Sequence, residues 1–288
     1  MIKCEIELVR DLAKQVAEIA ALPEQDEKRA LWRALNGKQP VRPMVMVDQV
    51  CWNEINVDDE LTLRCEDGAL REWETKLRRI LYQWKHFPVD MVVEDYMRVP
   101  KAITGISDFG INVKEHINVT DDTSDVFSHA YINQISSMED VEKIKTPVIF
   151  HDSAETDRRL TVADELFSGI IDFRADLEDV YICVWDTITT WMGVENVMYA
   201  LIEQPEMLHA MVKRMVDGYI SMLDQLEEQN LLTVPQALIH CTGAWTDELP
   251  QKKHDPQGSL QKTYGCLALP RFSAPYPPPC LTSLRSAP

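Results

Sequence analysis

The sequence has few glycines and lacks several common catalytic signatures. Only 10 of the 288 residues are glycine, and neither Gly-x-Gly-x-x-Gly nor a phosphate-binding loop occurs. Nucleotide-cradling loops depend on glycine, so their absence counts against a nucleotide-binding fold. Gly-x-Ser-x-Gly and His-Glu-x-x-His are missing as well, which leaves no standard hydrolase motif.

Basic residues are also scarce. Lys and Arg number 29 against 47 Asp and Glu, a net charge of −18. Phosphates repel an acidic surface, so we expect no nucleic-acid partner and no contact with an anionic membrane. No apolar run reaches 18 residues, so we expect no helix that spans a bilayer.

Signs of secretion are missing too. The N-terminus reads Met-Ile-Lys-Cys-Glu-Ile-Glu and has no uninterrupted apolar stretch, so it does not resemble a signal peptide. The seven cysteines show no regular framework of spacings. Free thiols in a reducing cytoplasm are the expectation.

Enough apolar sequence is present for a core, since 45% of the residues are hydrophobic. The length allows two small domains or one large α/β barrel. Apolar residues at steps of three and four predict long helices over residues 2–20, 24–36, 68–86 and 205–230. Short apolar runs predict buried strands at residues 44–47, 89–93, 147–150, 180–185 and 237–239. The alternation favours βα units around a parallel sheet.

Three groups of segments, in this order, resemble one family. They are Arg29–Gly37 with Arg42–Val45, Val89–Asp95 with Val99–Ala102 and Gly105, and Gly193–Glu195 with Gln204–His209. Together they are similar to the uroporphyrinogen decarboxylase superfamily over roughly residues 25–250. The resemblance implies a TIM (β/α)8 barrel with its site at the carboxyl ends of the strands.

The family contains two chemistries. Its decarboxylases remove carboxylates from a porphyrinogen, and its cobamide-dependent methyltransferases move a methyl group between a corrinoid and a small acceptor. The decarboxylase segment Arg-Gln-Ala-Gly-Arg is replaced here by Asp48–Glu54, which has no arginine for a polyanionic substrate. We therefore expect the methyltransferase type, with a decarboxylase of tetrapyrrole biosynthesis as the alternative.

Acids and aromatic groups follow the predicted strands, where a barrel would hold a small-molecule substrate. Asp95 matches the family's acid after the second predicted strand and is the candidate catalytic acid or base. The candidate substrate-binding residues are Asp48, Trp52, Glu54, Glu94, His151 and Asp186. For each, the alternative is an ordinary loop or helix-capping residue.

His240 and Cys241 are candidate zinc ligands, because imidazole and thiolate both bind zinc. The family's methyltransferases have a similar His-x-Cys strand end and a distant third Cys. Here the two residues are adjacent, and neighbours on a strand point to opposite faces. A buried Cys beside a hydrogen-bonded His is the alternative. The resemblance also implies a corrinoid as methyl carrier, with a corrinoid protein as the candidate partner that presents it.

Residues 251–288 differ from the rest of the chain. They hold seven of the 16 prolines and five basic residues against Asp255 alone, a net charge of +4, which leaves −22 for residues 1–250. We expect a helical segment at 1–40, a partial barrel at 41–250 and an aberrant, Pro-rich disordered tail at 251–288.

Out-of-frame translation would produce such a tail and leave the barrel incomplete; a genuine short paralogue is the alternative. An inactive truncated fragment or binding protein is therefore a further alternative to the enzyme. The oligomeric state stays open.

Overall fold

The protein is a mixed α/β molecule. The computed structural model describes residues 3–48, 50–56, 58–119, 127–177, 180 and 182–232. In this part of the chain, no helix is long and apolar enough to cross a membrane. None of the sheets it contains closes into a barrel.

The long helices lie where their apolar periodicity predicts them. They are α1 (Lys3–Ala20), α2 (Pro23–Asn36), α3 (Gly68–His86) and α8 (Pro205–Glu228). Their ends follow local chemistry. The Asp67 carboxylate caps α3 by accepting from the backbone N–H groups of Ala69 and Leu70, and Gly37 follows the last residue of α2.

The strands form three two-stranded sheets. β1 (Tyr96–Pro100) pairs in parallel with β6 (Asp172–Asp176), while β2 (Ile103–Thr104) pairs with β5 (Phe150–His151) and β3 (Glu115–Asn118) with β4 (Ser128–Tyr131), both antiparallel. Helix α5 (Ser153–Phe167) precedes β6 and packs against both strands of the parallel pair. This helix-covered parallel pair is the one sheet of βα type among the described residues.

Three predicted strands are wrong, and a fourth, at 147–150, is a strand only at its last residue, Phe150. Residues 44–47 and 89–93 are irregular, and Val184 opens a helix, α6 (Val184–Met192). The apolar run at 89–93 is explained by burial, because Met91, Val92 and Val93 all lie in the core. β1 begins only at Tyr96. The predicted strand at 237–239 lies outside the described residues.

The Asp90 side chain links the two irregular segments, 44–47 and 89–93, which do not pair as strands. Its carboxylate accepts from the backbone N–H of Val45 at 2.8 Å and from Arg42 Nη1 at 2.9 Å. The backbone N–H of Asp90 donates to the carbonyl of Val45 at 3.0 Å. Buried backbone groups must find partners, and here a carboxylate supplies one.

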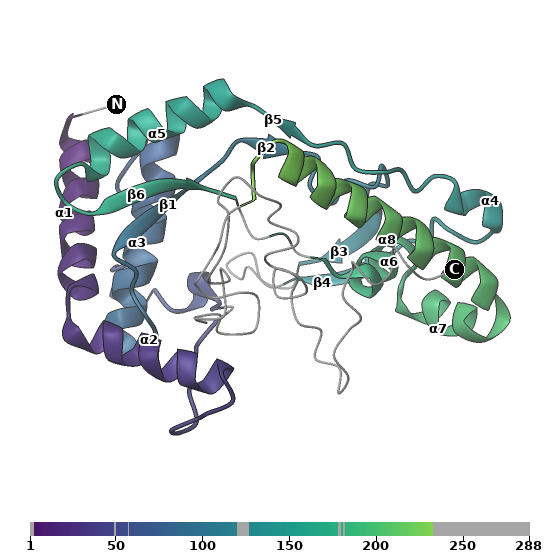
Figure 1. The fold of residues 1–288 in the computed structure, drawn as a ribbon, viewed down its shortest axis with the longest axis horizontal. Coiled ribbons are helices and arrows are strands. Elements are labelled where there is room, and N and C mark those ends of the chain that lie inside the picture. The colour runs from purple at the N-terminus through teal and green to yellow at the C-terminus, as the bar shows by residue number, and fades with distance from the viewer. Residues whose placement is uncertain are drawn as a thin grey trace.

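One hydrophobic cluster packs α1, α3 and α5 against the parallel pair, at the left of Figure 1. Val9, Leu77, Met97 and Leu166 are among its buried members. Arg10 of α1 ties this cluster together by donating to carbonyls at the end of α5, including that of Glu165 at 2.8 Å.

A second cluster packs α8 against α6, α7 (Val194–Glu203) and α4 (Met138–Val141), at the right of Figure 1. Four methionines of α8 are buried here, as their helical spacing predicts: Met207, Met211, Met215 and Met222. Phe109 packs edge-on against Tyr219, with ring centroids 4.9 Å apart. The methionine stripe is therefore core packing.

Candidate functional site

The parallel pair has one apolar and one polar face. Met97 and Val99 of β1 are buried under the helices. Neighbouring residues on a strand point to opposite faces, so Tyr96 and Arg98 occupy the other face. The parallel register sets Arg98 opposite Arg174 of β6.

Arg98 and Arg174 each hold a neighbouring group on this polar face. Arg98 Nε donates to Asp176 Oδ2 at 2.8 Å, and its Nη2 donates to the carbonyl of Leu177 at 2.9 Å. The Arg174 guanidinium lies 3.6 Å from the centroid of the Tyr96 ring. The side chain of Asp176 is 3% exposed, so Arg98 compensates a buried negative charge at the carboxyl end of β6.

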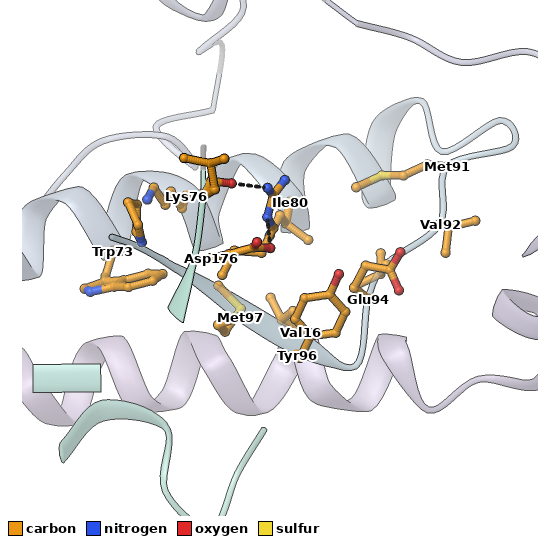
Figure 2. A pocket seen from close by; sticks show the side chains of 14 residues that line it. Val16, Trp73, Lys76, Ile80, Met91, Val92, Glu94, Tyr96, Met97 and Asp176 are labelled. Carbon is orange, nitrogen blue, oxygen red and sulfur yellow. Dashed lines mark hydrogen bonds and ion pairs between the residues drawn. The ribbon is translucent and has the colours of Figure 1, made fainter. Parts of the chain in front are cut away.

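A cavity of about 680 Å³ lies beside β1, within the range that holds drug-sized molecules. Figure 2 shows it between α3 and β1, with Asp176 on its wall. Residues from both faces of β1, Tyr96 and Met97, contribute to the lining. The lining residues are Val16, Trp73, Lys76, Ile80, Met91, Val92, Val93, Glu94, Tyr96, Met97, Arg98, Pro100, Asp176 and Leu177. Most of these side chains are apolar, with a few charged groups among them.

Tyr96 brings a hydroxyl group into this cavity (Figure 2). Burial raises the pKa of the Tyr96 hydroxyl, and the nearby Glu94 carboxylate raises it further. The group therefore stays protonated at neutral pH and can donate a hydrogen bond.

Lys101 follows β1 directly. Its backbone N–H donates to the carbonyl of Asp176 at 2.9 Å, and its Nζ donates to the carbonyl of Leu231 at 3.1 Å. Burial lowers the pKa of the Lys101 ammonium, and the Asp176 charge opposes that shift. Arg98, Lys101 and Asp176 thus gather polar chemistry at the carboxyl ends of the two parallel strands.

Asp95 lies at the other end of these strands. It precedes β1 instead of following a strand, because residues 89–93 are irregular. It lines a second cavity of about 560 Å³ with Asp26, Arg29 and Asp172. In α/β barrels the chemistry sits at the carboxyl ends of strands, so the premise that made Asp95 a catalytic candidate is wrong. Glu94, by contrast, lines the larger cavity.

The candidates after the first predicted strand have no strand before them. Asp48 is exposed and follows irregular chain. Trp52 and Glu54 lie in a short 3-10 helix, η1 (Trp52–Glu54), where the Trp52 ring packs edge-on against Tyr82 with centroids 6.4 Å apart. None of these three predicted residues lines either cavity.

His151 and Asp186 are also displaced from their expected places. His151 lies inside β5, with its Nε2 3.0 Å from Thr156 Oγ1. Asp186 is exposed in the first turn of α6. Neither lines either cavity. The predicted zinc ligands His240 and Cys241 lie outside the described residues.

Among the residues that the structure describes, no three or more His, Cys, Asp or Glu side chains come together in a way that could hold a metal ion. The described residues therefore do not fit a zinc site by themselves.

Sequence reasoning missed Tyr96, Arg98, Lys101 and Asp176 as site residues. One signal was available, since charged residues alternate at positions 172, 174 and 176, the spacing of one strand face. Comparison with protein-family models, curated proteins and solved structures finds no match to this chain.

Proposed function

We propose that this chain is a corrinoid-dependent methyltransferase of the uroporphyrinogen decarboxylase type, with β1 and β6 as neighbouring strands of its barrel. The motif resemblance over residues 25–250 supports the family. The observation that carries the proposal is the Arg98–Asp176 pair on the wall of a ligand-sized cavity, with Asp176 at the carboxyl end of β6 in a helix-covered parallel pair.

The cavity beside β1 would hold the small methyl acceptor. A corrinoid is larger than a drug-sized molecule, so it would be presented from outside, on a partner protein. When bound, a methylated corrinoid supplies an electrophilic methyl group. The apolar walls exclude water from the acceptor, the Tyr96 hydroxyl donates a hydrogen bond to it, and Asp176 is placed to take its proton.

The zinc proposal rests on His240 and Cys241, and no step is assigned to zinc. Zinc content of the purified chain tests it separately. A cytoplasmic location belongs to the same proposal, in keeping with the free thiols that the sequence predicts.

A pair of variants on one strand tests the proposed chemistry. Asp176→Asn removes the carboxylate at the carboxyl end of β6, and Asp172→Asn is the matched control at its amino end. With methylcob(III)alamin and 3-mercaptopropionate or homocysteine, we expect S-methylated product by mass spectrometry. Losing a proton acceptor costs about 100-fold or more in rate, so Asp176→Asn should fall by that factor and Asp172→Asn should stay within about twofold.

Thermal unfolding of both variants shows whether the loss is one of folding, since Asp176 also balances Arg98. If the wild-type chain methylates neither thiol, or if folded Asp176→Asn keeps full activity, the proposal is wrong. Release of carbon dioxide from uroporphyrinogen would instead support the decarboxylase alternative.

A further inference from the structure

Among the described residues, the charges that line the large cavity are paired, with the exception of Lys76. Asp176 pairs with Arg98 at 2.8 Å, and Glu94 pairs with Arg29 at 3.2 Å. No carboxylate of the described chain lies within 4.0 Å of the Lys76 ammonium, which is the fourth charged group of the lining. The cavity therefore presents one uncompensated positive charge.

The position of Lys76 suits a ligand at the cavity rim. Its Nζ lies 4.7 Å from the centroid of the Trp73 ring, a cation–π contact that holds the side chain against the wall. Lys76 is exposed whereas Trp73 is buried, so the ammonium is accessible to an anion that enters from solvent.

A second polar group stands further along the cavity. In the described part of the chain, the Tyr96 hydroxyl forms no hydrogen bond with protein, and Figure 2 shows it directed into the space below Ile80. Apolar wall lies between these two polar groups, including Met97. One cation and one donor separated by apolar surface fit an elongated molecule better than a compact one.

We propose that this cavity binds an elongated monocarboxylate with an apolar or aromatic body. Its carboxylate meets Lys76, its body lies along Trp73 and Met97, and an acceptor atom faces the Tyr96 hydroxyl. A polyanion would leave most of its charges unmatched, and a cation would meet Lys76 with like charge. The assignment rests on the proposed function only in taking this ligand as the methyl acceptor; binding itself needs no methyl transfer.

Calorimetric titration with three probes of one shape tests the assignment. The probes are 3-phenylpropionate, its neutral amide and 3-phenylpropylamine. An ion pair with the exposed Lys76 separates acid from amide, and such pairs contribute up to about 1 kcal/mol. We therefore expect the acid to bind up to about fivefold more tightly than the amide. The amine should bind more weakly than either.

Two lysines of α3 supply the matched variants. Lys76→Gln should bring acid and amide to within about twofold of each other. Lys85→Gln removes another exposed charge of the same helix, which pairs with Glu60 and does not line the cavity, and it should keep the full preference. Tyr96→Phe should weaken binding of 4-oxo-4-phenylbutanoate, which carries an added acceptor, more than binding of 3-phenylpropionate.

Failure here is distinguishable from failure of the proposed function. If 3-phenylpropionate does not bind, or if Lys76→Gln keeps the full preference for acid over amide, the ligand assignment is overturned whatever the methyl-transfer assay gives. If the acid binds through Lys76 but no methyl group moves, the assignment stands and the methyltransferase proposal falls.

Discussion

Glu74 is the most deeply buried carboxylate of α3, with no exposed surface. It accepts from the backbone N–H groups of Arg64 and Cys65, at 2.9 and 2.8 Å, and from Arg78 Nε at 2.7 Å. Burial alone would raise the pKa of the Glu74 carboxyl, but these donors together lower it. Burial, with Glu74 beside it, raises the pKa of the Cys65 thiol to about 12, so that thiol stays protonated.

Replacing Glu74 should therefore be costly. Glu74→Gln removes the charge that balances Arg78 and puts an amide N–H₂ toward backbone donors, so we expect the free energy of unfolding to drop by about 3–5 kcal/mol. Urea denaturation measures this. Glu72→Gln on the exposed side of the same helix should change it by less than about 0.5 kcal/mol. Equal effects from the two variants would contradict the assigned role.

The sequence predicts the helices of this protein well and its strands poorly. The apolar stripes of α1 and α3 are local patterns, and they predict both helices within a residue or two. β6 reads Asp-Phe-Arg-Ala-Asp, and three charges in five residues do not predict a strand. It forms because its apolar side packs on the core, while its charges meet β1 partners that lie 78 residues away in sequence.

Because the strands are poorly predicted, the candidate site is also predicted in the wrong place. The apolar run at 89–93 predicts a strand there, whereas β1 begins seven residues after the start of that run, at Tyr96. As a result, Asp95 lies just before the amino end of β1, and not after the carboxyl end of a strand, where barrel sites lie. The groups at the true carboxyl ends, Arg98 and Asp176, come from segments distant in sequence, and only the folded chain brings them together.

Gly218 lets α8 approach a neighbouring loop closely. A Cβ atom there would lie 2.7 Å from Cε1 of Phe109 and 3.2 Å from Cδ of Pro147. Gly218→Ala should gain up to about 1 kcal/mol of helix propensity and lose more by overpacking, for a net destabilisation of about 1–2 kcal/mol. Thermal and urea unfolding test the sign.

Gly68→Ala is the control for that substitution. A Cβ at Gly68, in the first turn of α3, meets nothing within 4 Å, so this variant should be at least as stable as the wild type. A gain in stability from Gly218→Ala as well would mean that Phe109 and Pro147 yield easily.

For the whole molecule, two charge effects compete as the pH falls. Below neutrality, protonation first relieves the repulsion of a chain with a net charge of −18. At lower pH, protonation reaches carboxyls whose pKa is lowered by neighbouring cations. Lys143 lowers the pKa of Asp140, and Arg158 that of Glu155, each to about 2. Arg42 also lowers the pKa of Asp90. Groups with a depressed folded-state pKa stabilise above their unfolded pKa, near 4, and lose that contribution as the pH falls toward 2.

We therefore expect the urea midpoint to rise slightly from pH 7 to about pH 5, close to the isoelectric point of about 4.8, and to fall steeply below pH 4. Added salt should raise the midpoint at pH 7 by screening like charges. A midpoint at pH 3 as high as that at pH 5 would show that these carboxyls do not contribute.

The arrangement around α1 also shapes how this protein emerges from the ribosome. α1 is made before its partners, which are α3 and the distant α5, and Arg10 of α1 donates hydrogen bonds to carbonyls of α5. At about 5–20 residues per second, α5 follows on the order of ten seconds later. During that interval the side of α1 that packs against α5 in the folded protein stays exposed. We therefore expect chaperones to bind this apolar helix face on the nascent chain.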